Sequence, residues 1–409
     1  MADLELTRFL LSLVLLLFFS LSIGHLFNVI GLPRVIGEIS AGLILGPSLL
    51  GFLSPDLFEW IFSGFSEQKK LLSVFYWLGL IFLMFTAGFN VSTKFTPGTG
   101  RLIFLLILGG LGLPFLFGLA AANLIPNSMT VDPLSFALVM AAASAVTSIP
   151  VVTKIFMDLN LLSTRFAQVV LSAAAVQDLI LWLVLSIALS IQQGQPDASF
   201  RISDVLLMVA GTLCFGAAVL FLIPRIIRHV GRILLDYSPD ASLVGYTMLV
   251  CLLLVCIASV LHINVVFAAL LAGVVVGGQP GARFEIVKQN ISDVSAWFFV
   301  PIYFALVGLQ MNIPGNFDPV LILGFLLGSS AIKIVSVALF SRFARISWES
   351  AVDYGITMNA RGGPGIVLAS LAFAGGIIDE ALFVGLVVVS IVSSLVAGVW
   401  LKFRLGAIR

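Results

Sequence analysis

Charged side chains are scarce in this chain: of its 409 residues, only 10% are Asp, Glu, Lys or Arg, whereas 60% are hydrophobic. A water-soluble globular protein needs more polar side chains than this to cover its surface. The 21 basic and 20 acidic residues nearly cancel, so no excess of charge points to nucleic acid or to a charged partner. The composition therefore excludes the soluble classes and indicates an integral membrane protein.

Cysteine and histidine are also rare. Cys214, Cys251 and Cys256 lie inside apolar runs, which favours packing roles over disulfide bonds or metal ligation. The three histidines are far apart and do not have metal-ligand spacing. An intramembrane enzyme would need paired catalytic acids or a His-x-x-x-His motif, and the sequence has neither. We therefore expect no enzyme, no cofactor and no metal other than a transported cation.

Long apolar runs recur along the chain, and runs of about 18 or more residues are typical of membrane-spanning helices. Divided at Pro, Gly and charge clusters, the sequence predicts an all-α polytopic membrane protein with about thirteen transmembrane helices. We expect these spans at about residues 8–28, 33–53, 71–90, 101–125, 133–156, 163–192, 202–224, 242–261, 263–279, 290–311, 319–341, 349–375 and 379–402.

The basic residues are distributed unevenly over the connections between these spans. With the N-terminus outside, about 15 Lys and Arg fall on the cytoplasmic side and about 4 on the other, in agreement with the positive-inside rule. One span more or fewer would scramble this alternation. We therefore expect the N-terminus outside, the C-terminus in the cytoplasm, and a plasma membrane location (the bacterial inner membrane).

Two spans are interrupted by proline. In ASAVTSIPVVTKIF, Pro150 removes a backbone hydrogen-bond donor, and in NARGGPGIVLAS, Pro364 does the same among three glycines. Simple proline kinks, which membrane helices tolerate, are one explanation. We favour the other, a pair of discontinuous helices at matching places in an internal repeat, because such pairs mark transport sites near the bilayer midplane.

The spacing along the chain supports this repeat. Each break falls in the fifth span of its half, and a single linker span gives the two halves opposite topology. Asp178 lies 28 residues after Pro150, and Val392, beside two serines, lies 28 residues after Pro364, so only the first half carries an acid. We expect one transmembrane domain over 1–409, with a first repeat at about 8–192, a linker helix at about 202–230, a second repeat at about 242–402 and no soluble regulatory domain.

Asp178 is an acid within the apolar run SAAAVQDLILWLV. A charge at the centre of a spanning helix costs about 2.5–3.5 kcal/mol on insertion scales, so such residues face a bundle interior or a water-filled path. A lone carboxylate can hold a proton or a small cation, whereas both together would leave uncompensated charge. Competition between the two is what an exchanger needs. For Asp178, the alternatives are an acid neutralised by protonation and a buried ion pair that serves only assembly. Lys333, deep in a later span, is expected to pair with Asp178, and snorkelling to the membrane interface is the alternative.

Three polar residues near Asp178 or the first break are candidate cation ligands. Gln177 lies about 100° around the helix from Asp178 and offers an amide oxygen, although a helix-packing role explains it as well. Thr147 and Ser148 stand just before Pro150, where hydroxyl and freed carbonyl oxygens would suit a hard cation. Repair of the freed backbone groups is the alternative for both hydroxyls.

Arg361 lies in the second break, where its fixed charge is expected to offset the dipoles of opposed half-helices, with Asn359 assisting. Direct ligation is disfavoured because an arginine repels cations. Glu38 lies near the end of the second span and either pairs with Arg34, four residues earlier, or lines an access path.

Several stretches together resemble the second branch of the monovalent cation/proton antiporter superfamily, which includes potassium-efflux exchangers, NapA-like sodium/proton antiporters and plant cation/proton exchangers. The matching segments are GLPRVIGEISAGLILGPSLLG, AVTSIPVVTKIFMDLNLL, SAAAVQDL, FVPIYFALVGLQM, AIKIVSV and MNARGGPGIVLASLAF. The resemblance implies an NhaA-like fold with crossed discontinuous helices, a homodimer and elevator-like alternating access. It also implies that Asp178 binds proton and cation in turn, that Thr147 and Ser148 lie at the crossing, and that Lys333 is the core lysine.

The departures from this family also carry expectations. Sodium exchangers that move unequal charge resemble one another in having two adjacent acids, whereas the Gln177–Asp178 pair is similar to the potassium-efflux branch and implies electroneutral potassium exchange. Many relatives have an acid shortly after the Arg-Gly of the second break, where this chain has Gly363 and Pro364. The nucleotide-binding domain of many potassium-branch relatives is missing from this sequence, which implies a separate regulatory subunit or a removed C-terminal domain.

The sequence thus predicts a secondary active transporter that exchanges protons for K⁺ or Na⁺ at Asp178. Its expected partners are a monovalent cation, a proton, membrane lipid and a second copy of the chain, with no nucleic acid. An ion-coupled carrier of a small organic anion, attracted by Arg361 and helix N-termini, is the alternative within transport. A structural scaffold would need neither Asp178 nor Lys333.

Overall fold

The computed structural model describes residues 3–30, 34–89, 99–125, 132–159, 161, 164–193, 202–237, 240–261, 263–279 and 281–406. Helices make up nearly all of these residues, and the described ranges contain no β-strand. Within them, nine helices are long and apolar enough to cross a membrane, and four more apolar helices are shorter. The predicted all-α membrane architecture is confirmed, whereas the number of crossings stays a prediction.

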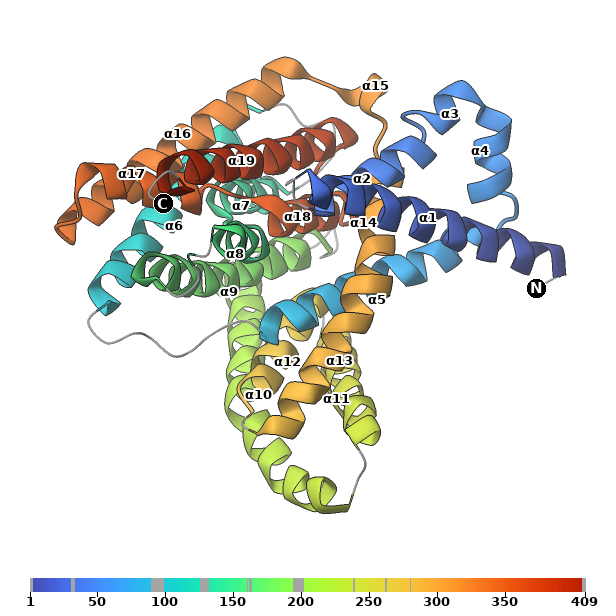
Figure 1. Cartoon of the computed structure of the whole chain (residues 1–409), viewed down its shortest axis with the longest axis horizontal. Coiled ribbons are helices and arrows are strands. Elements are labelled where there is room, and N and C mark those ends of the chain that lie inside the picture. The colour runs from blue at the N-terminus through green and yellow to red at the C-terminus, as the bar shows by residue number, and fades with distance from the viewer. Residues whose placement is uncertain are drawn as a thin grey trace. The chain divides into compact units, whose positions relative to one another are not determined.

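The chain divides into two compact units, each built from two separate segments (Figure 1). Unit 1 comprises Met1–Val91 and Val209–Gly315, and unit 2 comprises Ser92–Met208 and Asn316–Arg409. The chain passes from unit 2 to unit 1 within one long helix, α10 (Ile202–Tyr237). Each unit therefore takes one segment from each half of the chain, an arrangement that agrees with the internal repeat.

Unit 1 is held together by close helix approaches. Its helices are α1 (Asp3–Val29), α2 (Arg34–Leu45), α3 (Leu50–Leu53), α4 (Pro55–Phe62), α5 (Gln68–Phe89), α11 (Asp240–Val260), α12 (Val265–Gly277), α13 (Ala282–Val294), the π-helical turn η1 (Ser295–Phe299) and α14 (Val300–Leu309). Helix α2 lies so close to α14 that a Cβ on Gly42 would lie 1.9 Å from the carbonyl oxygen of Ala305. Small residues at such crossings are typical of packing between membrane helices.

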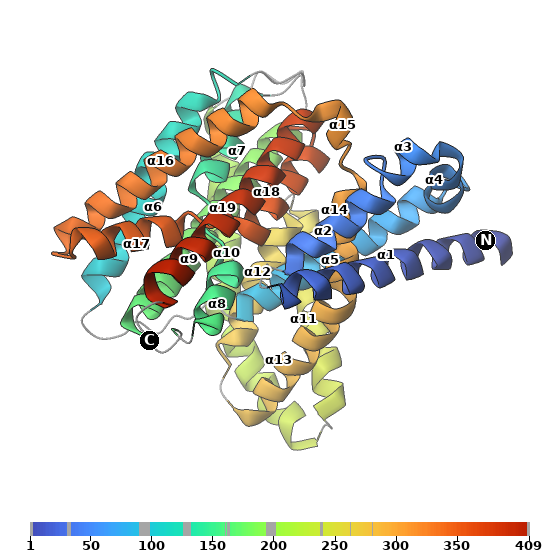
Figure 2. The same cartoon turned by 45° about the horizontal axis from the view of Figure 1, so that its top comes forward.

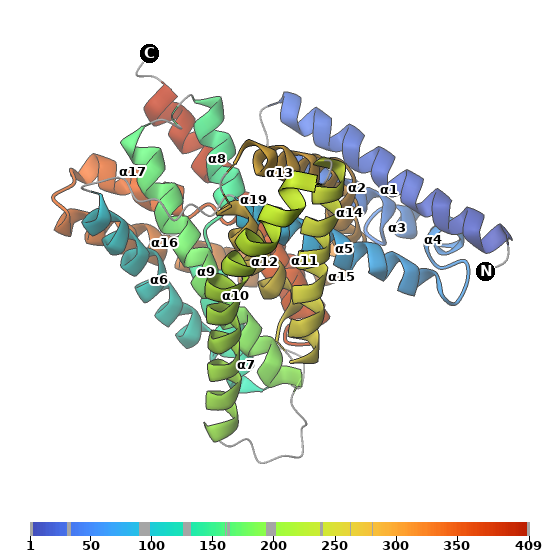
Figure 3. The same ribbon diagram turned by 90° about the horizontal axis from the view of Figure 1, so that it is seen from below.

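Unit 2 repeats one pattern twice: a long helix, two short helices separated by a break, and a second long helix. The first set is α6 (Gly100–Ala121), α7 (Pro133–Ala145), α8 (Ile149–Asp158) and α9 (Arg165–Gln193). After the short α15 (Ile313–Asn316), the second set is α16 (Pro319–Phe343), α17 (Trp348–Met358), α18 (Gly362–Ala374) and α19 (Glu380–Gly406). Helix α16 runs beside α6 (Figure 2), and α8 lies against α19 (Figure 3).

A buried apolar cluster joins the two sets of unit 2. It contains Leu106 of α6, Val152 and Phe156 of α8, Val170 of α9 and Met358 of α17. The cluster lies directly beside the breaks, since Met358 is the last residue of α17. The breaks are therefore set in a packed, apolar surrounding.

The three cysteines are free thiols, as expected, but only Cys251 is buried. Cys214 and Cys256 are exposed on the apolar helices α10 and α11. Packing inside the protein therefore explains Cys251 and not the other two.

Candidate functional site

The first break of unit 2 lies between Ala145, where α7 ends, and Ile149, where α8 begins. Pro150 is the second residue of α8, a position at which its missing N–H costs no bond within the helix. In a continuous helix the ring of Pro150 would meet the carbonyl of Val146, and Val146 instead has an extended backbone, with φ −63° and ψ 139°. The proline thus explains why the helix ends one turn before it.

The second break lies between Met358, where α17 ends, and Gly362, where α18 begins. Gly362 has φ +41°, and a Cβ at this position would also lie 2.4 Å from Cγ2 of Val151 on α8. Its N–H donates to Oγ of Ser394 on α19 at 2.8 Å. Pro364 is the third residue of α18. The discontinuous helices expected from the sequence are confirmed in both halves of the chain.

The two breaks touch each other. The backbone N–H of Ser148 donates to the carbonyl oxygen of Ala360 at 2.6 Å. The hydroxyl of Thr147 lies 2.8 Å from the carbonyl oxygen of Met358, to which it can donate. Thr147 and Ser148 are both fully buried. The broken helices therefore cross at their interruptions, and backbone groups of one break satisfy those of the other.

Lys333 of α16 reaches into the first break. Its Nζ donates to the carbonyl oxygens of Ala145 and Val146 at 2.7 and 2.6 Å and to Oγ1 of Thr147 at 2.9 Å. An ammonium group has three donors, so all of them are used. Two of the acceptors are the free carbonyls at the C-terminal end of α7, where the helix dipole is negative. Lys333 thus caps a broken helix with its charge.

Asp178 of α9 is only 7% exposed. Its Oδ1 is buried, has no hydrogen-bond partner among the residues that the structure describes, and forms no ion pair with Lys333 there. The pairing expected from the sequence is not found because the ammonium is occupied by α7. Asp178 is therefore left with a free oxygen in an apolar surrounding.

Gln177, the residue before Asp178 on α9, joins α9 to α6. Its Nε2 donates to the carbonyl oxygen of Leu106 at 3.0 Å, and its Oε1 lies 3.1 Å from the hydroxyl of Thr147. That hydroxyl has one proton, so it donates either to Gln177 or to Met358. Gln177 thus orients the hydroxyl that Lys333 also contacts.

Gly110 of α6 leaves space for the side chain of Gln177. We expect Gly110→Ala to displace the Gln177 amide and to destabilise the protein. A Cβ on Gly110 would lie 2.2 Å from Nε2 of Gln177, which forces the amide off Leu106. Overpacking of this kind costs about 1–3 kcal/mol. Thermal unfolding in detergent should show the loss, whereas Gly112→Ala, with open space at its Cβ, should leave the melting temperature unchanged or raise it slightly.

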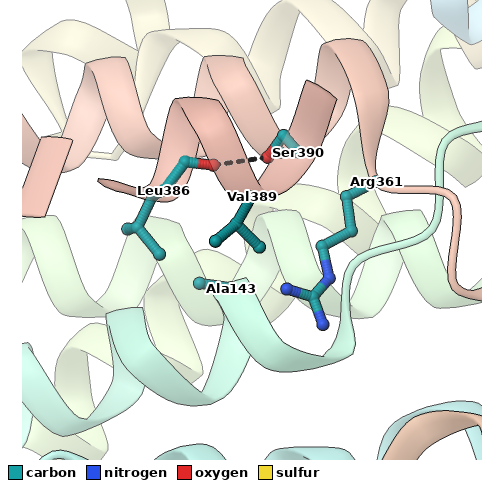
Figure 4. Close-up of a pocket in the computed structure, with 6 residues that line it drawn as sticks. Ala143, Arg361, Leu386, Val389 and Ser390 are labelled. Carbon is teal, nitrogen blue, oxygen red and sulfur yellow. Dashed lines mark hydrogen bonds between the residues drawn. The ribbon is translucent and has the colours of Figure 1, made fainter. Parts of the chain in front are cut away.

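Arg361 of the second break is 1% exposed. Its Nη2 donates to Oγ of Ser329 at 2.7 Å and lies 3.5 Å from Oδ1 of Asn359. The side chain borders a narrow crevice with Ala143 of α7 and Ser390 of α19 (Figure 4). Ser329 lies one helical turn before Lys333 on α16. Helix α16 therefore contacts both breaks: its Ser329 binds Arg361 of the second break, and its Lys333 binds the first break.

The site as a whole brings together the polar residues expected from the sequence, except that Asp178 and Lys333 are not bonded. Serines 329 and 394 and Gly110 were not singled out in the sequence. Ser394 is two residues after Val392, the position that corresponds to Asp178 in the repeat. The repeat spacing was therefore the one signal in the sequence that could have identified Ser394. Chemically, the arrangement offers one free carboxylate oxygen next to a crossing whose other polar groups largely satisfy one another.

Comparison with known proteins agrees with this geometry. A family model described as "Sodium/hydrogen exchanger, transmembrane" matches residues 13–406. The Cation/H(+) antiporter 19 of Arabidopsis thaliana is 27% identical over 400 residues, which cover 96% of this chain and 49% of that protein. The Na(+)/H(+) antiporter NhaS4 of Synechocystis is 26% identical over 387 residues, which cover 91% of each.

The fold is shared with a solved structure. The sodium proton antiporter MjNhaP1 of Methanocaldococcus jannaschii superposes with a TM-score of 0.66 at 16% identity, over 99% of this chain and 98% of that chain. This chain spans only about half the length of the plant relatives it matches, 49% of antiporter 19 and 48% of antiporter 18. The resemblance found in the sequence is nevertheless confirmed, because the family model covers nearly the whole chain: this integral membrane protein belongs to the sodium/hydrogen exchanger family of transporters.

Proposed function

We propose that the protein is a secondary active transporter that exchanges protons for K⁺ or Na⁺ by alternating access, and that Asp178 binds the two competitively. The observation that carries this proposal is the buried Oδ1 of Asp178, which has no partner among the described residues, while all three donors of Lys333 are used by Ala145, Val146 and Thr147. A buried carboxylate without a partner is costly unless a proton or a cation compensates it. Binding one therefore removes the need for the other.

The remaining oxygen ligands would come from neighbouring groups. Thr147 and Gln177 are engaged with each other and with backbone carbonyls in this conformation. We propose them and Ser148 as cation ligands only in conformations that break these bonds. The transported cation is the substrate, and no cofactor takes part in the proposal.

The assembly and membrane orientation are proposals of the same kind. The distribution of basic residues supports an N-terminus outside and a C-terminus in the cytoplasm of a plasma membrane. A homodimer is proposed by resemblance. The relatives named above are called Na⁺/H⁺ and cation/H⁺ antiporters, which supports a monovalent cation without choosing between K⁺ and Na⁺.

Competition can be measured with the native chain in proteoliposomes that contain a fluorescent pH reporter. Addition of K⁺, Na⁺ or Li⁺ should drive protons out, and the ranking of the ions identifies the substrate. Where Asp178 is mostly protonated, each drop of one pH unit should raise the cation concentration for half-maximal rate about tenfold, with the maximal rate unchanged. A maximal rate that falls while this concentration stays constant contradicts a shared site.

An organic-anion carrier is the alternative, and the structure gives one observation in its favour. Nε and Nη1 of Arg361 are buried and have no hydrogen-bond partner in the described part of the chain. The crevice beside them is, however, too narrow for a water molecule. Uptake of labelled carboxylates together with the lack of any cation-driven proton movement would favour this alternative.

A further inference from the structure

Three exposed arginines meet at one corner of unit 2, where α6 begins and α16 ends. Nη2 of Arg101, the second residue of α6, donates to the carbonyl oxygen of Phe343, the last residue of α16, at 3.0 Å. Arg342 belongs to the same last turn of α16, and Arg345 lies in the connection to α17, which begins at Trp348. Helices α6 and α16 run side by side (Figure 2). We call Arg101, Arg342, Arg345 and Trp348 the arginine corner.

The three arginines of this corner form no ion pair with a described carboxylate. Neither α6 nor α16 contains an acidic residue. The acid that follows them in sequence, Glu349, binds Arg404 at 3.2 Å. The ion pairs found among the described residues involve Arg34, Lys70, Lys288 and Arg404. The arginine corner is therefore a concentrated positive charge.

Most hydrogen-bond donors of the corner are unused among the described residues. A guanidinium has five N–H donors, of which Arg101 uses one on Phe343 and Arg342 one on the carbonyl of Ile346. Cζ of Arg342 also lies 5.1 Å from the ring centroid of Trp348, a contact that favours one orientation of the guanidinium. The planar fork of a guanidinium matches two oxygens of a phosphate group. The corner thus offers several phosphate-binding forks in one place.

An exposed apolar surface adjoins the arginines on the same two helices. Phe104, one turn after Arg101, is 59% exposed, and Leu339, one turn before Phe343, is 43% exposed. Phe343 itself is 63% exposed and Trp348 56%. Exposed tryptophan is typical of the headgroup level of a membrane. Charged donors followed within one turn by apolar side chains match a phospholipid, whose charged headgroup is followed by acyl chains.

Basic residues at helix ends also orient a membrane protein during insertion. That role requires only charge on one side of the membrane, and it does not require side chains from distant segments to meet. Arg101 and Phe343 are 242 residues apart in sequence and in contact. Orientation during insertion therefore does not account for the convergence of the three arginines.

We propose that the arginine corner is a binding site for one anionic phospholipid, whose phosphate is held by the guanidinium groups and whose acyl chains lie along Phe104 and Leu339. Basic groups beside a membrane helix attract anionic lipids. The site is separate from Asp178, and the proposal does not depend on which ion the protein transports. Helix α16 also carries Lys333, and α17 ends at the second break, so bound lipid would stabilise the helices that form the crossing.

Native mass spectrometry of the protein, purified in a neutral detergent and titrated with phosphatidylglycerol or phosphatidylcholine, tests the binding. Phosphatidylglycerol should bind the native chain at least tenfold more tightly than phosphatidylcholine. Arg342→Gln and Arg345→Gln should each weaken phosphatidylglycerol binding about fivefold and leave phosphatidylcholine binding unchanged. Equal affinities of the native chain for the two lipids overturn the proposal.

Arg225→Gln is the matched control. Arg225 is an exposed arginine of α10 that donates to the carbonyl of Phe221, four residues away, as Arg342 does to Ile346. Its replacement should leave phosphatidylglycerol binding unchanged, and a loss equal to that of Arg342→Gln would show a general effect of charge and overturn the site. Arg342→Lys keeps the charge and should retain more phosphatidylglycerol binding than Arg342→Gln, which gives a second comparison with a milder substitution.

Thermal unfolding separates a lipid from a soluble phosphate. Phosphatidylglycerol should raise the melting temperature of the native chain and raise that of the double variant Arg342→Gln with Arg345→Gln much less. Glycerol phosphate at the same concentration should have no effect on either. An equal rise in both proteins, or a rise with glycerol phosphate as large as that with the lipid, overturns the assignment of a phospholipid site.

Discussion

Asp178→Asn is expected to abolish cation-driven proton movement and to leave the protein folded. The substitution keeps the size of the side chain and removes the negative charge on which proton and cation compete. Because Oδ1 of Asp178 has no partner among the described residues, no hydrogen bond is lost, and a buried charge disappears. The melting temperature should therefore stay the same or rise. The measurement is the pH-reporter assay in proteoliposomes, paired with thermal unfolding of the same preparation.

Asp353→Asn is the matched control. Asp353 is another buried acid of unit 2, 5% exposed, but its Oδ1 accepts a hydrogen bond from Nε1 of Trp400 at 2.9 Å and lies 3.6 Å from Nε of Arg404. Neutralising it should lower stability and leave exchange in place. Residual exchange in Asp178→Asn, or an equal loss in both variants, would show that Asp178 is not the site of competition.

The spans and the two breaks could be predicted from sequence because their causes are local. Apolar length alone identifies a membrane helix, and a proline inside a span marks a candidate break. Not every proline makes one, since α6 continues through Pro114 and α10 continues through Pro224. Pro150 and Pro364 accordingly marked the two breaks to within a few residues. The same local signals do not give the grouping of the helices into units 1 and 2, since this grouping depends on contacts between distant segments.

The partner of Lys333 could not be predicted for a related reason. In the sequence, Asp178 and Lys333 are the two conspicuous opposite charges, and pairing them is the simplest compensation. The structure supplies competing acceptors that belong to the backbone and so cannot be recognised from residue types: the carbonyl oxygens that are left without helix partners where α7 ends. Breaking a helix creates partial negative charge, and the lysine binds that charge in place of the carboxylate. The separation of the two residues is thus a consequence of the break itself.

The role of Gly110 is a third feature that could not be predicted from the sequence. In the sequence it is one of two adjacent glycines in an apolar helix, with no polar neighbour to mark it. Its importance comes from Gln177, whose amide occupies the space where a side chain would be. Such positions are recognised only when both helices are placed.

Lys333→Met is expected to destabilise unit 2 by an amount on the order of 3 kcal/mol, because a buried acceptor left without its donor costs about 1–3 kcal/mol. Methionine has a similar length and no donor, so the carbonyls of Ala145 and Val146 lose the ammonium that caps them. Removing the buried ammonium charge also removes its desolvation cost, which offsets part of this loss of stability. Thermal unfolding in detergent measures the effect as a fall in melting temperature.

Ser336→Ala provides the control on the same helix, since Oγ of Ser336 is buried and has no hydrogen-bond partner in the described residues. Its removal should change the melting temperature little. The decisive comparison is the double variant Asp178→Asn with Lys333→Met. If the two residues formed an ion pair, removing both charges would restore much of the stability that Lys333→Met loses. Because the ammonium is bonded to the carbonyls of the first break, Asp178→Asn should add no more stability to Lys333→Met than it adds to the native chain. A recovery to native stability would show that the charges compensate each other directly.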